Sequence, residues 1–504
     1  MSQPARISES MRPIAHEDFG EHEGRHLLGR AGFGGTIDQL RTLLEWGPET
    51  SVDHLLDVDA AMAALDRPVF HDGLVNKFTR AERLAFQRAI QSGDENTVAK
   101  YRVRRQQMQR ADRGQIREMR AWWLRQIIRT PYPLVEKMTL FWHGHFATSY
   151  RTIENSWHMF EQNMFFRRNA VGSFETLLQG IARDPAMLRY LDNHRNLKRS
   201  PNENFAREIM ELFALGDGYT ERDIREGARA LTGNTFEGNK FVFKANQHDD
   251  DTKRIFGVSG NFKGDDFVRL ILSRRQCPRF IVEKLYRFFV NEIPEAREPG
   301  GPQVQKVLRQ MAATMLRSRY RLKPVLRELF LSKHFYDAHN RGRMIKGPVE
   351  LIVGTVRTLG TPTRNEQTLL TSAARMGQEL FAPPSVKGWE GGRTWINTST
   401  MFERQNIANY LITGVMPAQR QGRNVKLTDT SPLLADLRLL GEDAANDAKR
   451  VGPYLCKKVL GEHAGGRHER ALLAYFADKN NRVNTQTLNG ALALLTASPE
   501  YQLV

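Results

Sequence analysis

Apolar residues recur at helical spacing along most of the chain. Within 102–129 they lie three and four positions apart from Ile116 to Ile127, which is the rhythm of an amphipathic helix, and the same rhythm returns in many later segments. Residues 241–243 instead alternate with lysines in the manner of a short strand. The pattern therefore predicts a mainly α protein, with a multi-helical, bundle-like body and one short β-hairpin near residues 235–257.

The segment 191–233 carries the clearest start and stop signals. Ser200-Pro201-Asn202-Glu203 has the form of a capping box, with serine at the N-cap, proline at the first helical position and glutamate reaching back. Gly216 suits the left-handed position at which such a helix ends. Thr220 and Asp223 repeat the capping pattern, so we expect two helices in tandem.

The first of these helices carries carboxylates and amides beside its apolar face. Asn204, Glu208 and Glu211 lie along one edge of that face on a helical wheel of about 100° per residue. A charge beside a buried stripe is costly without a partner or a metal, which makes Glu208 the better functional candidate. A buried salt bridge to one of the many arginines explains it equally well. Glu203 and Arg207 lie on the opposite side at i,i+4, where they can simply pair.

Histidines are the other candidate ligands or acid–base groups. His143 and His145 end a strongly apolar segment, and a continuous helix would point them about 200° apart, too far to share a metal. Gly144 between them can break the helix and let both converge. A buried histidine among aromatic residues is more often a hydrogen-bonded core residue. His248 and Asp249 follow the predicted hairpin, and imidazole beside carboxylate suits a metal or an oriented general base.

We expect four parts along the chain. Residues 1–20 form a flexible N-terminus, 21–415 the main helical domain with the His, Glu and Asn motifs, 416–430 a linker, and 431–504 a helical portion that packs on the main body. Within the main domain, the loop 381–400 is rich in Pro, Gly and Trp and is expected to be an ordered lid or packing element.

Composition adds one unusual feature, a strong positive charge. Across 504 residues, 74 Lys and Arg stand against 57 Asp and Glu, for a formal net charge of +17. Such a field attracts polyanions such as nucleic acid, anionic lipid head groups or acidic polysaccharide. Arginines concentrate in 102–129, where a solvated helix face is the simpler interpretation and a polyanion contact is the alternative. No zinc finger, basic zipper or other DNA-reading module appears, so sequence-specific DNA recognition is not expected.

Other sequence features bear on location and on cysteine chemistry. No apolar run approaches the roughly 18 residues of a membrane-spanning helix, so the chain is not expected to be transmembrane. Residues 1–20 contain no hydrophobic signal-peptide core, which favours the cytoplasm. Cys277 and Cys456 lie far apart and form neither a disulfide framework nor a CxxC metal motif.

Several motifs resemble one large bacterial family. In chain order they are RHLLGRAGFG, FWHGHFATS, DPAMLRYLDNHRN, PNENFAREIMELFALGDGYTERDIREGARALTG, NQHDDDTKRIFG, IKGPVEL, FAPPSVKGWEGGRTWIN and SPEYQL. Across nearly its whole length, the chain is thus similar to domain-of-unknown-function family 1800. The resemblance implies a predominantly α-helical fold and, from the gene neighbourhood of family members, a protein partner related to alkaline phosphatases and sulfatases. Members often carry export signals, so an exported or periplasmic location is the alternative to the cytoplasm.

Two functions are compatible with these residues. The first is a metal-dependent enzyme, a hydrolase or an oxidase, in which zinc, iron or manganese is held by imidazole and carboxylate groups. Its candidate ligands are His143, His145, Glu208, His248 and Asp249. Its candidate catalytic residues are Glu208, Asn204, Asn202, Glu203 and Arg207. The second is a non-catalytic protein that binds a polyanion or assembles with a phosphatase- or sulfatase-like partner.

Overall fold

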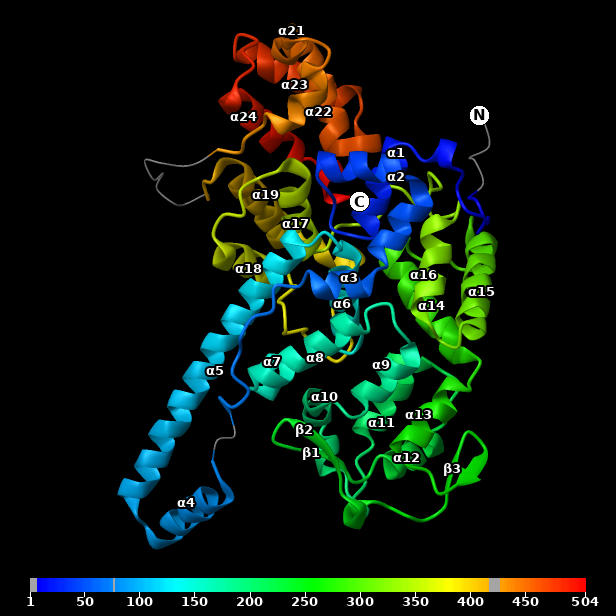
Figure 1. The fold of residues 1–504 in the computed structure, drawn as a ribbon, viewed down its shortest axis with the longest axis vertical. Coiled ribbons are helices and arrows are strands. Elements are labelled where there is room, and N and C mark those ends of the chain that lie inside the picture. The colour runs from blue at the N-terminus through cyan, green and yellow to red at the C-terminus, as the bar shows by residue number, and fades with distance from the viewer. Residues whose placement is uncertain (1–6, 76–77, 417–426) are drawn as a thin grey trace.

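The computed structural model describes residues 7–75, 78–416 and 427–504 (Figure 1). Helices make up most of it, which confirms the predicted mainly α class. The first half contains α1 (Glu21–Arg30), α2 (Ile37–Leu55), α3 (Val58–Ala63), α4 (Arg80–Ser92), α5 (Glu95–Arg129), α6 (Pro133–His145), α7 (Tyr150–Ile153), α8 (Ser156–Arg168), α9 (Phe174–Ile181), α10 (Pro185–Tyr190), α11 (Asn204–Glu208), a π-helix (Ile209–Ala214) and α12 (Glu221–Ala230). The second half contains α13 (Gly264–Leu272), α14 (Gln276–Phe289), α15 (Gly301–Arg317), α16 (Leu322–Leu331), α17 (Pro348–Leu359), α18 (Glu366–Arg375), α19 (Thr398–Thr413), α20 (Ala435–Arg438), α21 (Glu442–Asn446), α22 (Ala448–Leu460), α23 (Gly466–Asp478) and α24 (Thr485–Thr496).

The non-helical segment between α12 and α13 contains two antiparallel hairpins, where the sequence pattern indicated one. Strands β1 (Asn234–Glu237) and β2 (Lys240–Phe243) pair with each other, as do β3 (Lys253–Ile255) and β4 (Val258–Gly260). A 3-10 turn, Ala245–Gln247, separates the two hairpins.

Helix α6 lies at the centre of the body. Twelve of its thirteen residues are buried, as expected for a helix that is apolar on nearly all sides. Met138 and Trp142 pack into a core that includes α9 and α12–α16, whereas Leu140 packs into a second core with α5, α17–α19 and α22–α24. The second core also joins residues 431–504 to the helices that precede them.

Two ion pairs, each with a buried α6 side chain, fix α6 to its neighbours. Glu136 accepts hydrogen bonds from Arg167 of α8 at 2.7 and 2.9 Å. The second ion pair joins the adjacent residue, Lys137, to Glu350 of α17. The Lys137 ammonium also donates to the carbonyl of Gly32 at 2.7 Å. Both side chains of the first pair are almost inaccessible, at 1% and 4% exposure, so this pair is held in a water-free environment.

The chain before α1 is partly anchored to the body. In the segment expected to be a flexible N-terminus, Met11 and Ile14 are buried and the Ile14 amide donates to the Leu331 carbonyl at 2.7 Å. Residues 1–6 lie outside the described part of the chain, as does 417–426, which is most of the predicted linker. No described helix combines the length and the apolarity needed to cross a membrane.

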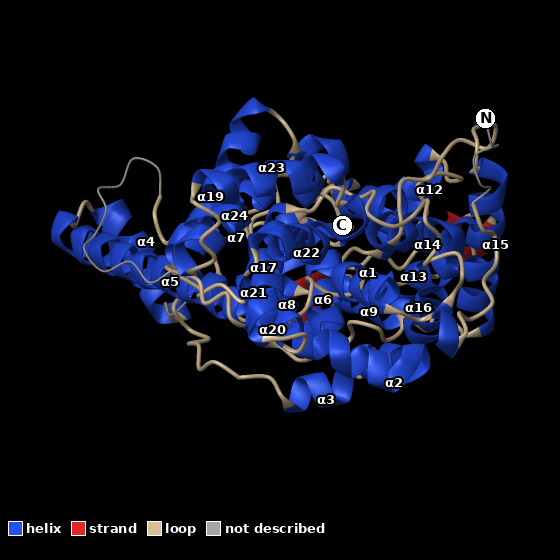
Figure 2. Cartoon of the chain, turned by 90° about the horizontal axis from the view of Figure 1, so that it is seen from above, coloured by secondary structure: helices blue, strands red, loops and turns tan. Residues whose placement is uncertain are grey.

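One element leaves the body. The first half of α5 projects from the other helices and carries α4 folded against its tip, which gives an elongated arm (Figure 1). The view from above shows the same projection (Figure 2). Phe86 of α4 packs on Tyr101 of α5, with ring centroids 5.2 Å apart, and this contact closes the hairpin of helices.

Candidate functional site

The helix that carries the predicted catalytic residues begins later than the capping pattern indicated. Ser200 is not its N-cap, because the Ser200 amide donates to the Leu197 carbonyl at 2.9 Å and holds this residue in a tight turn. Glu203 occupies the N-cap position without a capping hydrogen bond from its side chain. Asn202 takes over that role, since its Oδ1 accepts from the Asn204 amide at 3.0 Å.

The same helix changes type after Glu208. Ile209–Ala214 form a π-helix, in which backbone bonds span five residues in place of four. π-Helical turns are rare in proteins, and many of those that occur lie at functional sites. Here the carbonyl of Phe213 accepts a hydrogen bond from Nε2 of His145 at 2.9 Å. His145 is therefore neutral with its proton on Nε2, and burial lowers its pKa to about 3.

His143 lies in a different environment from His145. Its ring is surrounded by Trp123, Phe381 and Trp389, with centroids 5.5 to 5.7 Å away. Nε2 of His143 has no hydrogen-bond partner among the described residues. Burial in this aromatic surrounding lowers the pKa of His143 to about 3. Because α6 stays helical through His145, the two rings diverge as helical geometry requires.

Gly144 allows a close backbone contact and does not break the helix. The loop that contains Gly388 and Trp389 approaches α6 here, and a Cβ at Gly388 would lie 2.0 Å from the Gly144 carbonyl oxygen. Gly388 also has φ +80°, a left-handed conformation that favours glycine. The predicted ordering of the 381–400 loop is thus explained by direct packing on the last turn of α6.

Gly388→Ala is expected to destabilise the protein by more than the conformational cost of about 1–2 kcal/mol, because the added methyl also meets the Gly144 backbone. Gly257→Ala is the matched control, since Gly257 has φ +82° and nothing within 4 Å of an added Cβ. Urea unfolding followed by circular dichroism compares the two variants. Equal losses would show that the loop moves away from α6 without cost.

Glu208 lies in a half-buried group of ionisable residues. Burial raises the pKa of Glu208, the neighbouring Glu211 raises it further, and Arg207 and Lys387 oppose the shift. Burial also raises the pKa of Tyr190, and the charge of Glu208 adds to that effect. Sequence spacing could not indicate Lys387 or Tyr190, because both come from other segments. A carboxyl group with a raised pKa is the kind of group that serves as a general acid or base.

Arg207 joins the tandem helices and also pairs with Glu203 of its own helix. Arg207 pairs with Glu203 at 3.3 Å, at the predicted i,i+4 spacing, and also with Glu221 of α12 at 2.9 Å. Asn204 is exposed, and its side-chain amide reaches the Leu191 carbonyl at 3.4 Å. These contacts give Glu203, Arg207 and Asn204 structural roles.

His248 and Asp249 are adjacent in the chain but face different partners. Nδ1 of His248 donates to the Thr232 carbonyl at 2.8 Å, which leaves Nε2 without a partner in the described part of the protein. Asp249 receives two hydrogen bonds from Arg229 of α12, at 2.7 and 3.1 Å. Arg229 also bonds to Glu226, so Asp249 belongs to a structural ion-pair network.

A family model described as a protein of unknown function (DUF1800) matches residues 26–503. The chain belongs to the DUF1800 family. No curated protein and no solved structure matched the chain. The DUF1800 match confirms the resemblance seen in the motifs. The family description names no activity.

The DUF1800 structure does not bring the five predicted metal ligands into one cluster. His143 faces an aromatic cage, His145 uses Nε2 on the Phe213 carbonyl, and Asp249 is bonded to Arg229. Among the residues described, no three His, Cys, Asp or Glu side chains are placed to hold a metal ion. In this arrangement the five predicted ligands do not form one metal site. The metal cofactor therefore stays a prediction.

The arm is the second candidate site of this DUF1800 protein. A cavity of about 400 Å³ opens between the arm and the body, lined by three aromatic side chains, four arginines, two carboxylates and three other residues. The aromatic residues are Phe78, Phe86 and Tyr101, and the arginines are Arg83, Arg102, Arg105 and Arg189. The arginine run was visible in the sequence, whereas the aromatic groove beside it depends on how α4 folds back.

Proposed function

We propose that this protein binds an anionic polymer through the arm formed by α4 and the first half of α5. The observation that supports the proposal is that exposed arginines of the arm lack ion-pair partners among the described residues, while carboxylates of the arm are bonded to its own backbone and side chains. Arg102, Arg105 and Arg110 are exposed, and within the described ranges none of them pairs with a carboxylate. Because no described carboxylate pairs with them, these guanidinium groups are available to bind an anionic ligand.

The carboxylates of the arm are occupied locally. Glu82 accepts from the Thr79 amide at 2.7 Å and also pairs with Arg104 at the same distance. Asp94 caps α5 by accepting from the Thr97 amide at 3.1 Å. Asp112 is buried and accepts from Tyr150 at 2.7 Å. These three acidic residues therefore support the fold of the arm. Glu95, exposed at the first position of α5, is the remaining described carboxylate of the arm, and most of its described arginines make no ion pair.

The aromatic groove adds a second mode of contact. Tyr101 lies between Phe78 and Phe86, with centroids 5.5 and 5.2 Å away, and Arg102 and Arg105 line the same cavity. Aromatic rings beside arginines can stack on bases or sugar rings while the guanidinium groups meet phosphate or sulfate. Because such contacts do not read a base sequence, binding is expected to depend on charge and not on sequence.

The test is salt-dependent binding of heparin and of a labelled single-stranded oligonucleotide, measured by fluorescence anisotropy. Neutralising Arg102, Arg105 and Arg110 to glutamine is expected to weaken oligonucleotide binding at least tenfold at a fixed low salt concentration. Each lost phosphate contact should also reduce the slope of log K against log salt by roughly 0.7–0.9.

A matched triple variant carries the same charge change elsewhere. Arg269, Arg279 and Arg287 of α13 and α14 are exposed but already paired with carboxylates. Their replacement by glutamine is expected to leave the affinity within about twofold, because only long-range charge is lost. Equal losses from the two triples, or no binding of either polymer by the wild type, would refute the assignment to the arm.

A further inference from the structure

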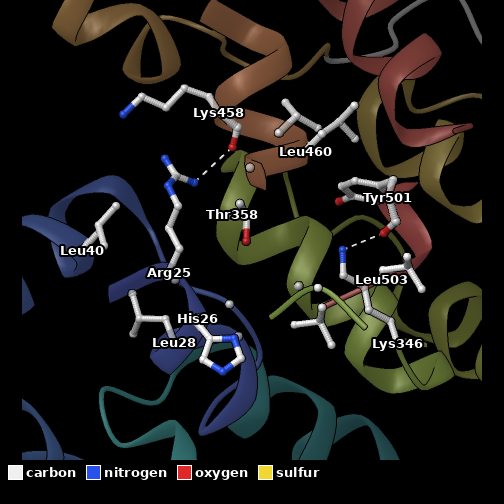
Figure 3. Close-up of a pocket in the computed structure, with 18 of the residues that line it drawn as sticks. Arg25, His26, Leu28, Leu40, Lys346, Thr358, Lys458, Leu460, Tyr501 and Leu503 are labelled. Carbon is white, nitrogen blue, oxygen red and sulfur yellow. Dashed lines mark hydrogen bonds between the residues drawn. The ribbon is translucent and has the colours of Figure 1, made fainter. Parts of the chain in front are cut away.

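A smaller cavity lies between α1, α17 and α22, beside the C-terminal residues of the chain (Figure 3). Its volume is about 180 Å³. Arg25 and His26 of α1, Thr358 of α17 and Leu460 of α22 line it, together with Tyr501 near the C-terminal end. The walls are mixed, with aliphatic side chains on several sides and cationic groups between them.

Lys346 supplies a polar group that the fold leaves only partly satisfied. Its ammonium donates one hydrogen bond, to the Tyr501 carbonyl at 2.7 Å, and lies 4.0 Å from the centroid of the Tyr501 ring (Figure 3). An ammonium has three donors. No further hydrogen-bond acceptor for it exists among residues 7–75, 78–416 and 427–504. Lys346 is half-buried and lines the cavity, so its remaining donors can meet a ligand there.

The nearby carboxylates are already paired with other cations. Glu350, the acidic side chain that lines the cavity, pairs with Lys137 and accepts from the Gly347 amide at 2.7 Å. Arg25 and Lys458 share one partner, Glu21, at 2.8 and 3.3 Å. The half-buried Lys346 ammonium makes no ion pair with a carboxylate among the described residues. A buried charge without a partner is costly, so an anion that enters the cavity would be stabilised there.

We propose that this cavity binds a small monocarboxylate, with the carboxylate on Lys346 and a short apolar part against Leu460 and Leu503. A carboxylate can meet the Lys346 ammonium while its apolar part packs on the aliphatic walls, whereas phosphate is polar on every side and has no group for those walls. The volume limits the apolar part, because a cavity of about 150 Å³ is filled by benzene. Butyrate has the right charge and size.

Calorimetric titration of the full chain with butyrate tests the proposal. Binding is expected for the wild type and for Lys333→Met, a control at an exposed lysine outside the cavity. Lys346→Met is expected to raise the Kd at least tenfold. Thr358→Leu keeps the ammonium but fills the cavity, and it should also abolish binding. Decanoate, which is too long, and inorganic phosphate should not bind.

The pH dependence provides a readout that survives if Lys346→Met fails to fold. Burial lowers the pKa of Lys346 to about 8. The ammonium is mostly present at pH 7 and mostly lost at pH 9, so wild-type affinity for butyrate should fall about tenfold between these values. Absence of butyrate binding, equal binding by a folded Lys346→Met, or binding of phosphate in place of butyrate would overturn the proposal.

Discussion

Replacing Glu136 by glutamine is expected to lower the free energy of unfolding by about 3–5 kcal/mol. The carboxylate accepts two hydrogen bonds from Arg167 and a third from Trp123 Nε1 at 2.9 Å. All three side chains are buried. Glutamine has nearly the same shape but no charge, so the Arg167 guanidinium would stay buried without its counter-charge. Because α6 lies between both cores, the loss affects the whole body.

A double-mutant cycle separates this effect from general sensitivity of the core. Urea unfolding is measured for Glu136→Gln, Arg167→Met and the double variant. The free energy of unfolding lost by the double variant should be smaller than the sum of the losses of the two single variants. Glu208→Gln is the control, since Glu208 is half-buried and makes no ion pair among the described residues. That control is expected to change stability by less than about 1 kcal/mol. A loss below about 1 kcal/mol for Glu136→Gln would mean that water reaches the pair.

The parts of the site that sequence predicted correctly depend on local geometry. The pairing of Glu203 with Arg207 follows from i,i+4 spacing, and the capping of α12 by Thr220 and Asp223 follows from their three-residue separation. The convergence of His143 and His145 that a break at Gly144 would allow is wrong, because α6 stays helical through His145 and the two rings diverge. Each of these features is set by neighbours within one turn of helix.

The features that sequence did not predict are set by partners far along the chain or by competing local bonds. Ser200 satisfies the capping pattern, but its amide is taken by the Leu197 carbonyl, and the pattern does not contain that information. The sequence indicated Asp249 as a metal ligand beside His248. In the structure, Arg229, twenty positions earlier in the chain, binds the Asp249 carboxylate. The π-helix has no periodic pattern of its own. The buried Phe213 carbonyl in this π-helix accepts from His145, which lies 68 residues away in the sequence.

The two proposed binding sites show the same distinction. The basic arm was visible in the sequence because its arginines follow one another along a single helix. The small cavity was not visible, because Arg25, Lys346 and Tyr501 approach one another only in the folded chain. Helix boundaries and charge runs are local properties, whereas a cavity depends on the packing of distant elements.

Acidification is expected to destabilise the protein through His143 and His145. The folded-state pKa of each is lowered to about 3 by burial, while an unfolded histidine titrates near 6.5. The unfolded state therefore binds more protons than the folded state between these values. Stability is fully present above pH 6.5 and is lost progressively as the pH falls toward 3. At pH 4.5 each histidine should account for a loss of roughly 2–3 kcal/mol.

Variants at the two histidines should behave differently, because only one of them makes a hydrogen bond through Nε2. His143→Phe places a ring of similar shape among Trp123, Phe381 and Trp389, so we expect little change at pH 7 and a recovery of roughly 2–3 kcal/mol at pH 4.5. His145→Phe removes the donor to the Phe213 carbonyl and should cost about 1–3 kcal/mol at both pH values, in addition to the same recovery at low pH. Urea unfolding at pH 7 and 4.5 measures both effects. If His143→Phe were as acid-sensitive as the wild type, His143 would be taking up its proton in the folded state, and the aromatic cage would have to open to water.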